Sequence, residues 1–527
     1  MVKQSVVFSF LIVSGAAVLS RICGFFREAS QAAVYGAGGE MDAFLAASSI
    51  IDMLSSLAGA VIVTAVVPVY GRYLARGRHK EGCRTVSSLL NILLAVSLFT
   101  AGICFLFAPA WVGLVAPGFP PERSAVSAKL LMILSPSVVL MVLVRVFSGI
   151  LQAHEDFNAQ SLAGLPFNLA VIAVILAFGP NHGISAAAAG VVAGFAGQVL
   201  ILIPSLRRTG YRYDLVFGWR SAGLREIAAL MLPVIMGTAA ADLNLLIQRA
   251  IGSGLPQGSL AALNYAQKLV GLPNGILVAS LVQVIYPVMS RLAAQAELQP
   301  LSAGENGRLR AVAAGGVAGI TFMMFPVVAG MIALNMPLTR LAYQRGAFDE
   351  NAVCLTAAGV AFYAAGLWGL SQRQLLNSAF YALEDTRTPM ALTIAAVLMN
   401  VAMSFSLAGR LGMPGLALAD SLTNNVLALI SFGLLSRRLN GMNGAAVLSA
   451  TIRILPAAVL AGMLMERIYL ITDDLPAGVF YQFLRLAVSF SAGFAAYLYL
   501  CALLRVRAVR LLKEIVKKGR AGFFKKE

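Results

Sequence analysis

Ionisable side chains stand inside long apolar stretches of this sequence of 527 residues. Eight are basic: Arg21, Arg27, Arg145, Arg249, Lys268, Arg373, Arg453 and Arg485. Five are acidic: Glu28, Asp42, Asp52, Asp242 and Asp420. If the stretches cross a membrane, each charge costs at least about 2.5–3.5 kcal/mol and needs a partner or a water-filled cavity. The excess of bases favours an anionic ligand, because the arginine fork matches phosphate oxygens.

The candidate binding residues lie in three of these stretches, within residues 6–35, 41–71 and 258–290. They are Arg21, Arg27, Asp42, Ser49, Asp52, Ser56 and Lys268. We expect them to line one cavity, in which the cations pair with phosphate oxygens and Asp42 orients an arginine or gates closure. Some charges have structural explanations. Arg21 and Glu28, seven residues apart, share a helical face, and Arg453 and Arg485 can extend toward the headgroups.

Motifs for catalysis are absent from the sequence, and no catalytic residue is predicted. There is no Gly-Lys dipeptide and therefore no P-loop, no Gly-x-Ser-x-Gly, and no metal-ligand spacing among His79, His154 and His182. The five cysteines are scattered without a Cys-x-x-Cys, as expected of small buried apolar side chains. The longest loops, 207–225 and 291–310, have about twenty residues each. An ATP-driven pump and an enzyme with a soluble head are both disfavoured.

The composition is that of a membrane protein. Hydrophobic residues make up 59% and charged residues 12% of the chain, against about 45–50% and 25% in soluble domains. This excludes a soluble enzyme, a disordered chain and a disulfide scaffold. The apolar residues run continuously instead of alternating, so we expect an all-α polytopic protein rather than a β-barrel.

Apolar runs between charged or Pro/Gly-rich breaks predict fourteen transmembrane helices. Their approximate bounds are 6–35, 41–71, 87–115, 126–153, 158–179, 184–206, 226–251, 258–290, 311–336, 351–383, 389–409, 413–436, 446–470 and 479–504. Several exceed 25 residues, which predicts tilts or kinks. Proline inside some of them weakens the local helical ladder, as at Pro136, Pro166, Pro233, Pro273 and Pro326.

The net charge of +17 follows mainly from topology. With a cytoplasmic N-terminus, 26 of the 40 Lys and Arg residues fall in cytoplasmic segments and only 6 on the opposite side. This asymmetry predicts a multi-pass protein of a cytoplasmic membrane with both termini inside. The tail 506–527 is then a basic juxtamembrane segment that attracts anionic membrane lipids. Nucleic-acid binding is disfavoured, because no binding module is present.

An internal repeat divides the chain. Residues 66–72 (VVPVYGR) match 285–291 (IYPVMSR), and 152–156 (QAHED) match 381–385 (YALED), each pair six spans apart. An even number of spans preserves direction, so the repeat is parallel. We predict a six-helix lobe at 1–225, a second at 226–440, two extra helices at 441–505 and the basic tail at 506–527. Transporters use such lobes for alternating access around a central site.

Several motifs together resemble a known family. They are 20–28 (SRICGFFRE), 36–38 (GAG), 42–44 (DAF), 67–70 (VPVY), 116–119 (APGF), 166–168 (PFN), 345–348 (RGAF), 380–382 (FYA), 385–389 (DTRTP) and 415–419 (GLALA). The set resembles the MurJ (MviN) lipid II flippases of the multidrug/oligosaccharidyl-lipid/polysaccharide exporter superfamily. The resemblance spans the whole chain and fits the fourteen-helix fold of that family.

The resemblance implies a transporter and not an enzyme. Lipid II, the undecaprenyl-pyrophosphate-linked disaccharide pentapeptide, would move from the inner to the outer leaflet of the bacterial cytoplasmic membrane for peptidoglycan synthesis. Arg21, Arg27 and Asp42 match cavity residues of the family, and a groove by the last two helices is implied for the lipid tail. Cell-wall synthesis machinery is a further expected partner.

Two positions depart from the family pattern. Ser55-Ser56 stands where the family often has an arginine, and Gln267-Lys268 where it often has Asp-Arg. Lysine keeps the charge but loses the bidentate fork. Some members hold a sodium ion in the C-terminal lobe. Asp242 and Asn400 are candidate ligands here, but Ser404 stands where a second acid would help. No other cofactor is expected, and sodium or the membrane potential would drive the cycle.

The leading hypothesis is therefore a lipid II flippase that works by alternating access. The departures leave open a divergent paralogue that exports another lipid-linked saccharide. A drug-cation exporter should have acids in excess, which this chain lacks. A polyprenyl-phosphate glycosyltransferase would need an acid-rich loop, and a non-transporting scaffold for cell-wall assembly is a further alternative.

Overall fold

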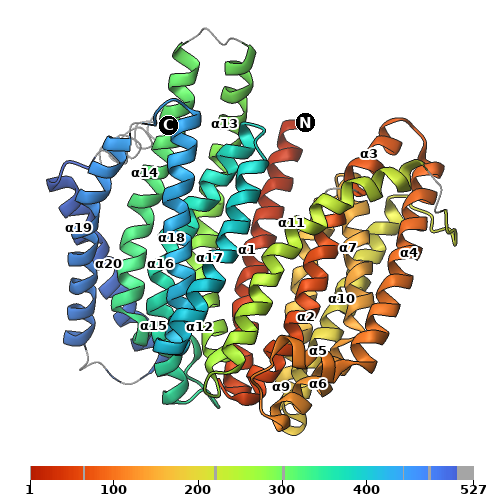
Figure 1. The fold of residues 1–527 in the computed structure, drawn as a ribbon, viewed down its shortest axis with the longest axis horizontal. Helices are drawn as coiled ribbons and strands as arrows, with labels where there is room; N and C mark the ends of the chain where they lie inside the picture. The colour runs from red at the N-terminus through yellow and green to blue at the C-terminus, as the bar shows by residue number, and fades with distance from the viewer. Residues whose placement is uncertain are drawn as a thin grey trace. The chain divides into compact units, whose positions relative to one another are not determined.

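The computed structural model describes residues 2–62, 66–218, 222–298, 303–442, 444–472, 476 and 478–506, and all regular elements in these residues are helical (Figure 1). The chain forms two compact units. The first comprises Met1–Ala261 with Tyr343–Ala352, and the second comprises Ala262–Ala342 with Val353–Glu527.

Helices up to α11 belong to the first unit. Their bounds are α1 Val2–Tyr35, α2 Gly39–Val61, α3 Val67–Ala75, α4 His79–Leu106, α5 Ala108–Val115, α6 Pro121–Leu134, α7 Ser137–Ala153, α8 Phe157–Leu162, α9 Gly164–His182, α10 Ser185–Arg208 and α11 Ala222–Ser253.

From α12 on, most of each helix belongs to the second unit. The bounds are α12 Ser259–Pro273, the π-helix η2 Asn274–Val278, α13 Ala279–Leu298, α14 Ala303–Ala333, α15 Asn335–Tyr343, α16 Glu350–Ala382, α17 Arg387–Leu411, α18 Met413–Arg438, α19 Gly444–Ile471 and α20 Val479–Leu503.

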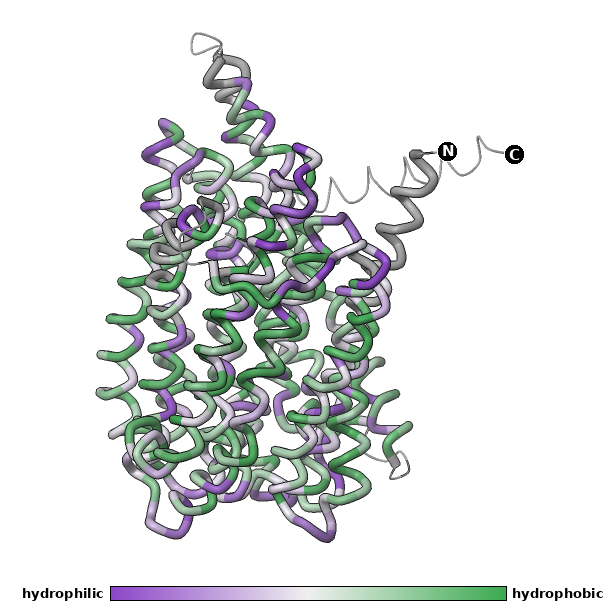
Figure 2. Tube along the Cα trace, turned by 90° about the vertical axis from the view of Figure 1, so that its right-hand side faces the viewer, coloured by the Kyte–Doolittle hydropathy of each residue, from purple (hydrophilic) through white to green (hydrophobic). Residues whose placement is uncertain are grey.

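The predicted multi-span helical architecture is confirmed. Eleven helical segments in the described residues are long and apolar enough to cross a membrane, and a bent pair of helices adds a twelfth. Figure 2 shows apolar helix middles and hydrophilic residues mainly toward helix ends and loops. The long helices α1 and α11 cover the remaining two predicted segments, 6–35 and 226–251. The count of fourteen crossings stays a prediction.

Two of the five prolines named above mark breaks in their helices. Pro136 stands between α6 and α7, which meet at a bend of 44°. Pro273 ends α12, and the chain continues as the π-helix η2. Proline lacks the N–H of the helical ladder and clashes with the preceding turn, which explains both breaks. Pro326 instead stays inside the continuous helix α14.

Some features of local structure recur along the chain. The long helix α4 is followed by the short α5, and α14 is followed by the short α15. Glu155 and Glu384 both adopt a left-handed conformation, with φ of 59° and 56°, where a helix ends. In each turn the next residue donates its N–H to a carbonyl five residues earlier, at 2.9 Å, as in a Schellman motif. Gly183 and Gly412, with φ of 59° and 66°, make the corresponding later turns.

Small residues bring α16 and α18 close together in the second unit. A Cβ at Gly366 would lie 2.4 Å from the Cα of Ser421, so only glycine allows this approach. Ser421 Oγ donates to the Phe362 carbonyl at 2.5 Å, and Gly369 N–H donates to Asn425 Oδ1 at 3.0 Å. These two helices carry Arg373 and Asp420, two of the intramembrane charges of this unit.

The compact units do not end where the predicted lobes end. Helix α11 groups with the preceding helices, and the first long stretch of the first unit ends at Ala261. The lobe boundary at 225/226 comes from the repeat, and it stays a prediction.

Candidate anion-binding site

The two α1 cations have different surroundings. Arg27 Nη2 donates to the Glu28 carboxylate at 2.6 Å, and its guanidinium lies 5.4 Å from the centre of the Phe167 ring. Arg27 Nε is buried and has no hydrogen-bond partner among the described residues. Arg21 is exposed on the same helix. Glu28 therefore forms an ion pair with its neighbour Arg27, and Arg27 keeps a donor for an anion.

The serines of the predicted polar stripe on α2 have separate roles. Ser49 is buried, and its hydroxyl donates to the Ala46 carbonyl at 2.7 Å, so its hydrogen bond lies within α2. Ser56 forms a hydrogen bond with Asp242 of α11. Asp52 is exposed on the same helix. The structure thus brings Ser56 together with Asp242, which the sequence associates with a sodium site.

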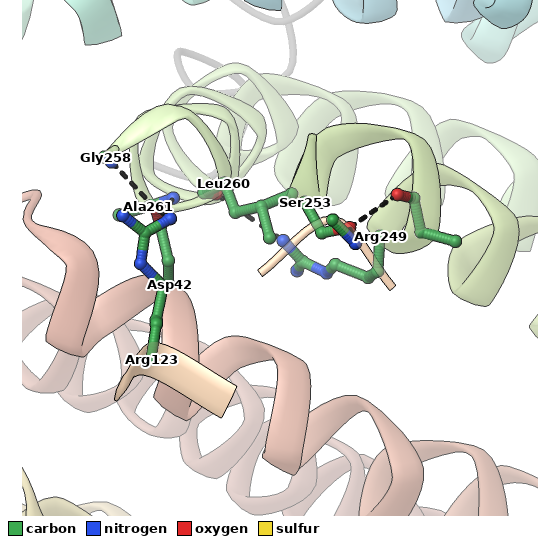
Figure 3. A network of polar contacts seen from close by, with 9 residues as sticks. Asp42, Arg123, Arg249, Ser253, Gly258, Leu260 and Ala261 are labelled. Carbon is green, nitrogen blue, oxygen red and sulfur yellow. Dashed lines mark hydrogen bonds and ion pairs between the residues drawn. The ribbon is translucent and has the colours of Figure 1, made fainter. Parts of the chain in front are cut away.

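Asp42 holds the start of α12. Its Oδ2 accepts the Gly258 N–H at 2.7 Å, and its Oδ1 accepts the Ala261 N–H at 2.8 Å (Figure 3). Arg123 Nη1 lies 3.9 Å from Oδ2, and Asp42 is only 2% exposed. A carboxylate at a helix N-terminus satisfies orphan N–H groups and complements the helix dipole. The described contacts of Asp42 are with Gly258, Ala261 and Arg123, and its expected role in orienting an arginine of α1 stays a prediction.

The same network continues along α11. Arg249 Nη1 donates to the Leu260 carbonyl at 3.5 Å, and the Ser253 hydroxyl donates to the Ala250 carbonyl at 2.7 Å. Gly118 N–H donates to Ser253 Oγ at 2.9 Å. Arg249 is buried at this position. Asp42, Arg123 and Arg249 thus belong to one network of polar contacts, and the substrate-binding role expected of Asp42 stays a prediction.

The remaining predicted residues lie in the second unit. Lys268 is exposed on α12, next to the exposed Gln267. Asn400 is buried on α17, and Ser404 Oγ lies 3.5 Å from its Oδ1. Asp242, the other sodium candidate, belongs to the first unit. In the described ranges, no three His, Cys, Asp or Glu side chains are grouped as a metal site would require.

A bridged charge pair joins α16 and α18. Arg373 Nη1 donates to Asn424 Oδ1 at 2.6 Å, and Asn424 Nδ2 donates to Asp420 Oδ2 at 3.0 Å. The amide therefore connects the two opposite charges. This arrangement offsets the cost of placing both charges in a membrane helix.

An apolar cavity of about 1810 Å³ lies in the second unit, between α12–α14 and the C-terminal helices α19 and α20. Its lining includes Phe322, Leu338 and Phe490. Among the described residues, the charged members of the lining are Arg310, Arg453 and Arg505. An apolar surface of this kind suits a long hydrocarbon chain. The resemblance implies a groove for the lipid tail beside the last two helices.

Two arginines of the first unit have contacts that the sequence did not predict. Arg123, for which the sequence predicts no role, approaches Asp42 Oδ2 to 3.9 Å. Arg145 was counted among the intramembrane bases without a role, and its Nη2 donates to Ser55 Oγ at 3.0 Å. Both contacts join residues about 80 to 90 positions apart, which spacing along one helix does not reveal.

A family model described as "Lipid II flippase MurJ" matches residues 31–488 of the chain. The chain is 28% identical over 447 residues to a probable lipid II flippase MurJ of Rhizobium tropici, and the aligned region covers 82% of each protein. It is 26% identical over 519 residues to a probable lipid II flippase MurJ of Vibrio cholerae, covering 96% of this chain and 97% of the relative.

Solved structures agree on the fold. A lipid II flippase MurJ in an inward closed conformation matches with a TM-score of 0.76 and 21% identity, covering 94% of this chain and 98% of that one. An inward-facing multidrug transporter of the MATE family and MOP superfamily matches with a TM-score of 0.65 and 14% identity, covering 82% and 99%. The family match leaves no support for the glycosyltransferase alternative. The chain belongs to the MurJ family of lipid II flippases.

Proposed function

We propose that this chain moves lipid II from the inner to the outer leaflet of a bacterial cytoplasmic membrane by alternating access. The observation that carries the proposal is the family match over residues 31–488. A flippase is a transporter rather than an enzyme, and the helical multi-span fold agrees with this class.

The pyrophosphate of the substrate would meet the cations of the chain. Arg21 and Lys268 are exposed on membrane helices, and Arg27 keeps a buried Nε donor. Guanidinium and ammonium groups form short charge-assisted hydrogen bonds with phosphate oxygens. Asp52 and Ser56 would line the same cavity. Ser49 would stabilise α2 through the hydrogen bond from its hydroxyl to the Ala46 carbonyl.

Asp42 takes a structural role in this proposal. Its carboxylate fixes the start of α12, the helix that carries Lys268. Release or formation of this contact would accompany gating. The apolar cavity beside α19 and α20 would take the undecaprenyl chain, because it offers a long apolar surface.

Two lobes, 1–225 and 226–440, would move around the substrate, with 441–505 as an addition. Both termini would be cytoplasmic, and the basic tail 506–527 would contact anionic lipids. Cell-wall synthesis enzymes would receive the product. The membrane potential, worth about 2.3 kcal/mol per charge and 100 mV, or a sodium ion would drive the cycle.

Complementation of a bacterium depleted of its own flippase tests this function. We expect the chain to restore growth and Arg27→Ala to fail at equal expression, because a charged hydrogen bond contributes about 1.5–3 kcal/mol, or roughly tenfold to a hundredfold in binding. Arg467→Ala removes an exposed cation elsewhere and should grow like the wild type. Growth of Arg27→Ala at the wild-type rate would contradict the role of this residue.

The departures from the family pattern favour one second candidate, a paralogue that exports another lipid-linked saccharide. Ser55-Ser56 and Gln267-Lys268 change the polar groups available to a headgroup. Native mass spectrometry of the purified protein separates the two candidates. Co-purified lipid II supports the first, and a different prenyl-linked sugar supports the second.

A further inference from the structure

Arg145 is an exposed cation in the middle of a membrane helix. It stands at the ninth position of the seventeen-residue helix α7. Within the described part of the chain, no carboxylate oxygen lies within 4.0 Å of its nitrogens. An arginine that faced lipid at this depth would be strongly unfavourable, so we expect the side chain to face a water-filled cavity.

The guanidinium is seated in a notch on α2. Nη2 donates to Ser55 Oγ at 3.0 Å, and Ser55 is only 8% exposed. One turn further on, a Cβ at Gly59 would lie 3.3 Å from the Arg145 Cζ and Nε, which is tighter than most real contacts. The absence of a side chain at Gly59 therefore leaves room for the arginine. Among the residues that the structure describes, one of the five N–H donors of the guanidinium has an assigned acceptor, so the group is held in place with further donors available.

We propose that Arg145, held by Ser55 and Gly59, is a further substrate-binding residue that contacts the pyrophosphate of the lipid-linked saccharide. The inference rests on the proposed function and deepens it. Ser55 accepts a hydrogen bond from Arg145, so a cation of α7 reaches the middle of α2 from a neighbouring helix.

The sharpest test measures lipid II binding after the positive charge of Arg145 is removed from α7 and after it is moved to α2. Purified full-length protein is titrated with lipid II and, separately, with undecaprenol, which has the same chain but no phosphate. We expect Arg145→Ala to weaken lipid II binding at least tenfold and to leave undecaprenol binding unchanged, because only charge-assisted contacts are lost. The double variant Arg145→Ser with Ser55→Arg, which moves the cation to α2, should recover most of the lost affinity.

Two control variants keep the result decisive. Lys129→Ala removes an exposed cation from the adjacent helix α6 and should bind lipid II like the wild type. Arg145→Lys keeps the charge without the fork, and we expect intermediate affinity. It also serves as the test variant if Arg145→Ala does not fold.

The outcomes separate the two proposals. Wild-type affinity for lipid II in both Arg145→Ala and Arg145→Lys would overturn the role of Arg145 and leave the proposed function intact. An equal loss of undecaprenol binding would also overturn it, because the effect would then not involve phosphate. Failure of the wild-type protein itself to bind lipid II would contradict the proposed function instead.

Discussion

Arg27 keeps a buried Nε donor without a partner although its Nη2 is bound to Glu28. Other membrane-embedded cations have backbone acceptors instead. Arg453 donates to the Leu504 carbonyl, and Arg485 donates to the Tyr469 carbonyl while its guanidinium lies over the Tyr469 ring. An unpaired buried donor is unfavourable unless a ligand satisfies it. A buried Nε of the same kind also occurs at Arg249 and Arg485, so at the residue scale this atom alone does not separate Arg27 from cations that only stabilise the fold.

Asp385, in the turn between α16 and α17, carries a testable pH dependence. Burial alone would raise the pKa of its carboxyl. Hydrogen bonds from the Thr388 N–H and hydroxyl, together with the charge of Arg438, hold that pKa below its usual value. The stabilisation is therefore present above the unfolded pKa of about 3.9 and is lost as the pH falls through the lower folded pKa.

We expect Asp385→Asn to lower the free energy of unfolding at pH 7 by about 1–3 kcal/mol, since it loses charge-assisted hydrogen bonds. The difference from the wild type should shrink as the pH falls below about 4. Thermal unfolding in detergent at several pH values measures it. Glu384→Gln removes the exposed neighbouring carboxylate and should change little. A gap that is constant between pH 7 and pH 3 would rule out this explanation.

At the element scale, Asp42 links α2 to the start of α12, and Arg123 links α6 to the same carboxylate. Asp42→Ala leaves the buried Gly258 and Ala261 N–H groups without their acceptor. We expect it to lower the free energy of unfolding by about 2 kcal/mol or more. Asp42→Asn keeps one acceptor oxygen and should have a smaller effect.

Thermal unfolding of the purified variants checks this expectation. Glu40→Gln changes an exposed acid two residues earlier and is the matched control. An Asp42→Ala protein that unfolds at the wild-type temperature would show that the carboxylate does not hold α12.

Helices were the most predictable elements. Apolar length predicted 351–383, 413–436 and 479–504, and α16, α18 and α20 end within two residues of these bounds. Breaks inside spans were harder to predict. The span 87–115 is divided into α4 and α5, and Pro109 stands in the first turn of α5, where it cannot donate an N–H to the end of α4. The length of the apolar run does not report such a break.

At the scale of the whole molecule, the sequence predicted which residues carry charge in the membrane but not how they pair. Glu28 pairs with its neighbour Arg27, Asp42 caps a helix more than 200 residues away, and Arg145 reaches Ser55 from another span. Partner choice of this kind follows from tertiary packing. Family membership came from motifs along the whole chain, and the family match confirms it.

The most direct test of the central claim is the rate at which lipid II crosses the bilayer in proteoliposomes that contain the purified chain. Labelled lipid II starts in one leaflet, and its appearance in the other is followed by a membrane-impermeant quencher. The account predicts transfer well above that of protein-free vesicles, and a rate at least tenfold lower for Arg27→Ala. Lipid II transfer no faster than in protein-free vesicles, from folded wild-type protein with a membrane potential and sodium supplied, would contradict it.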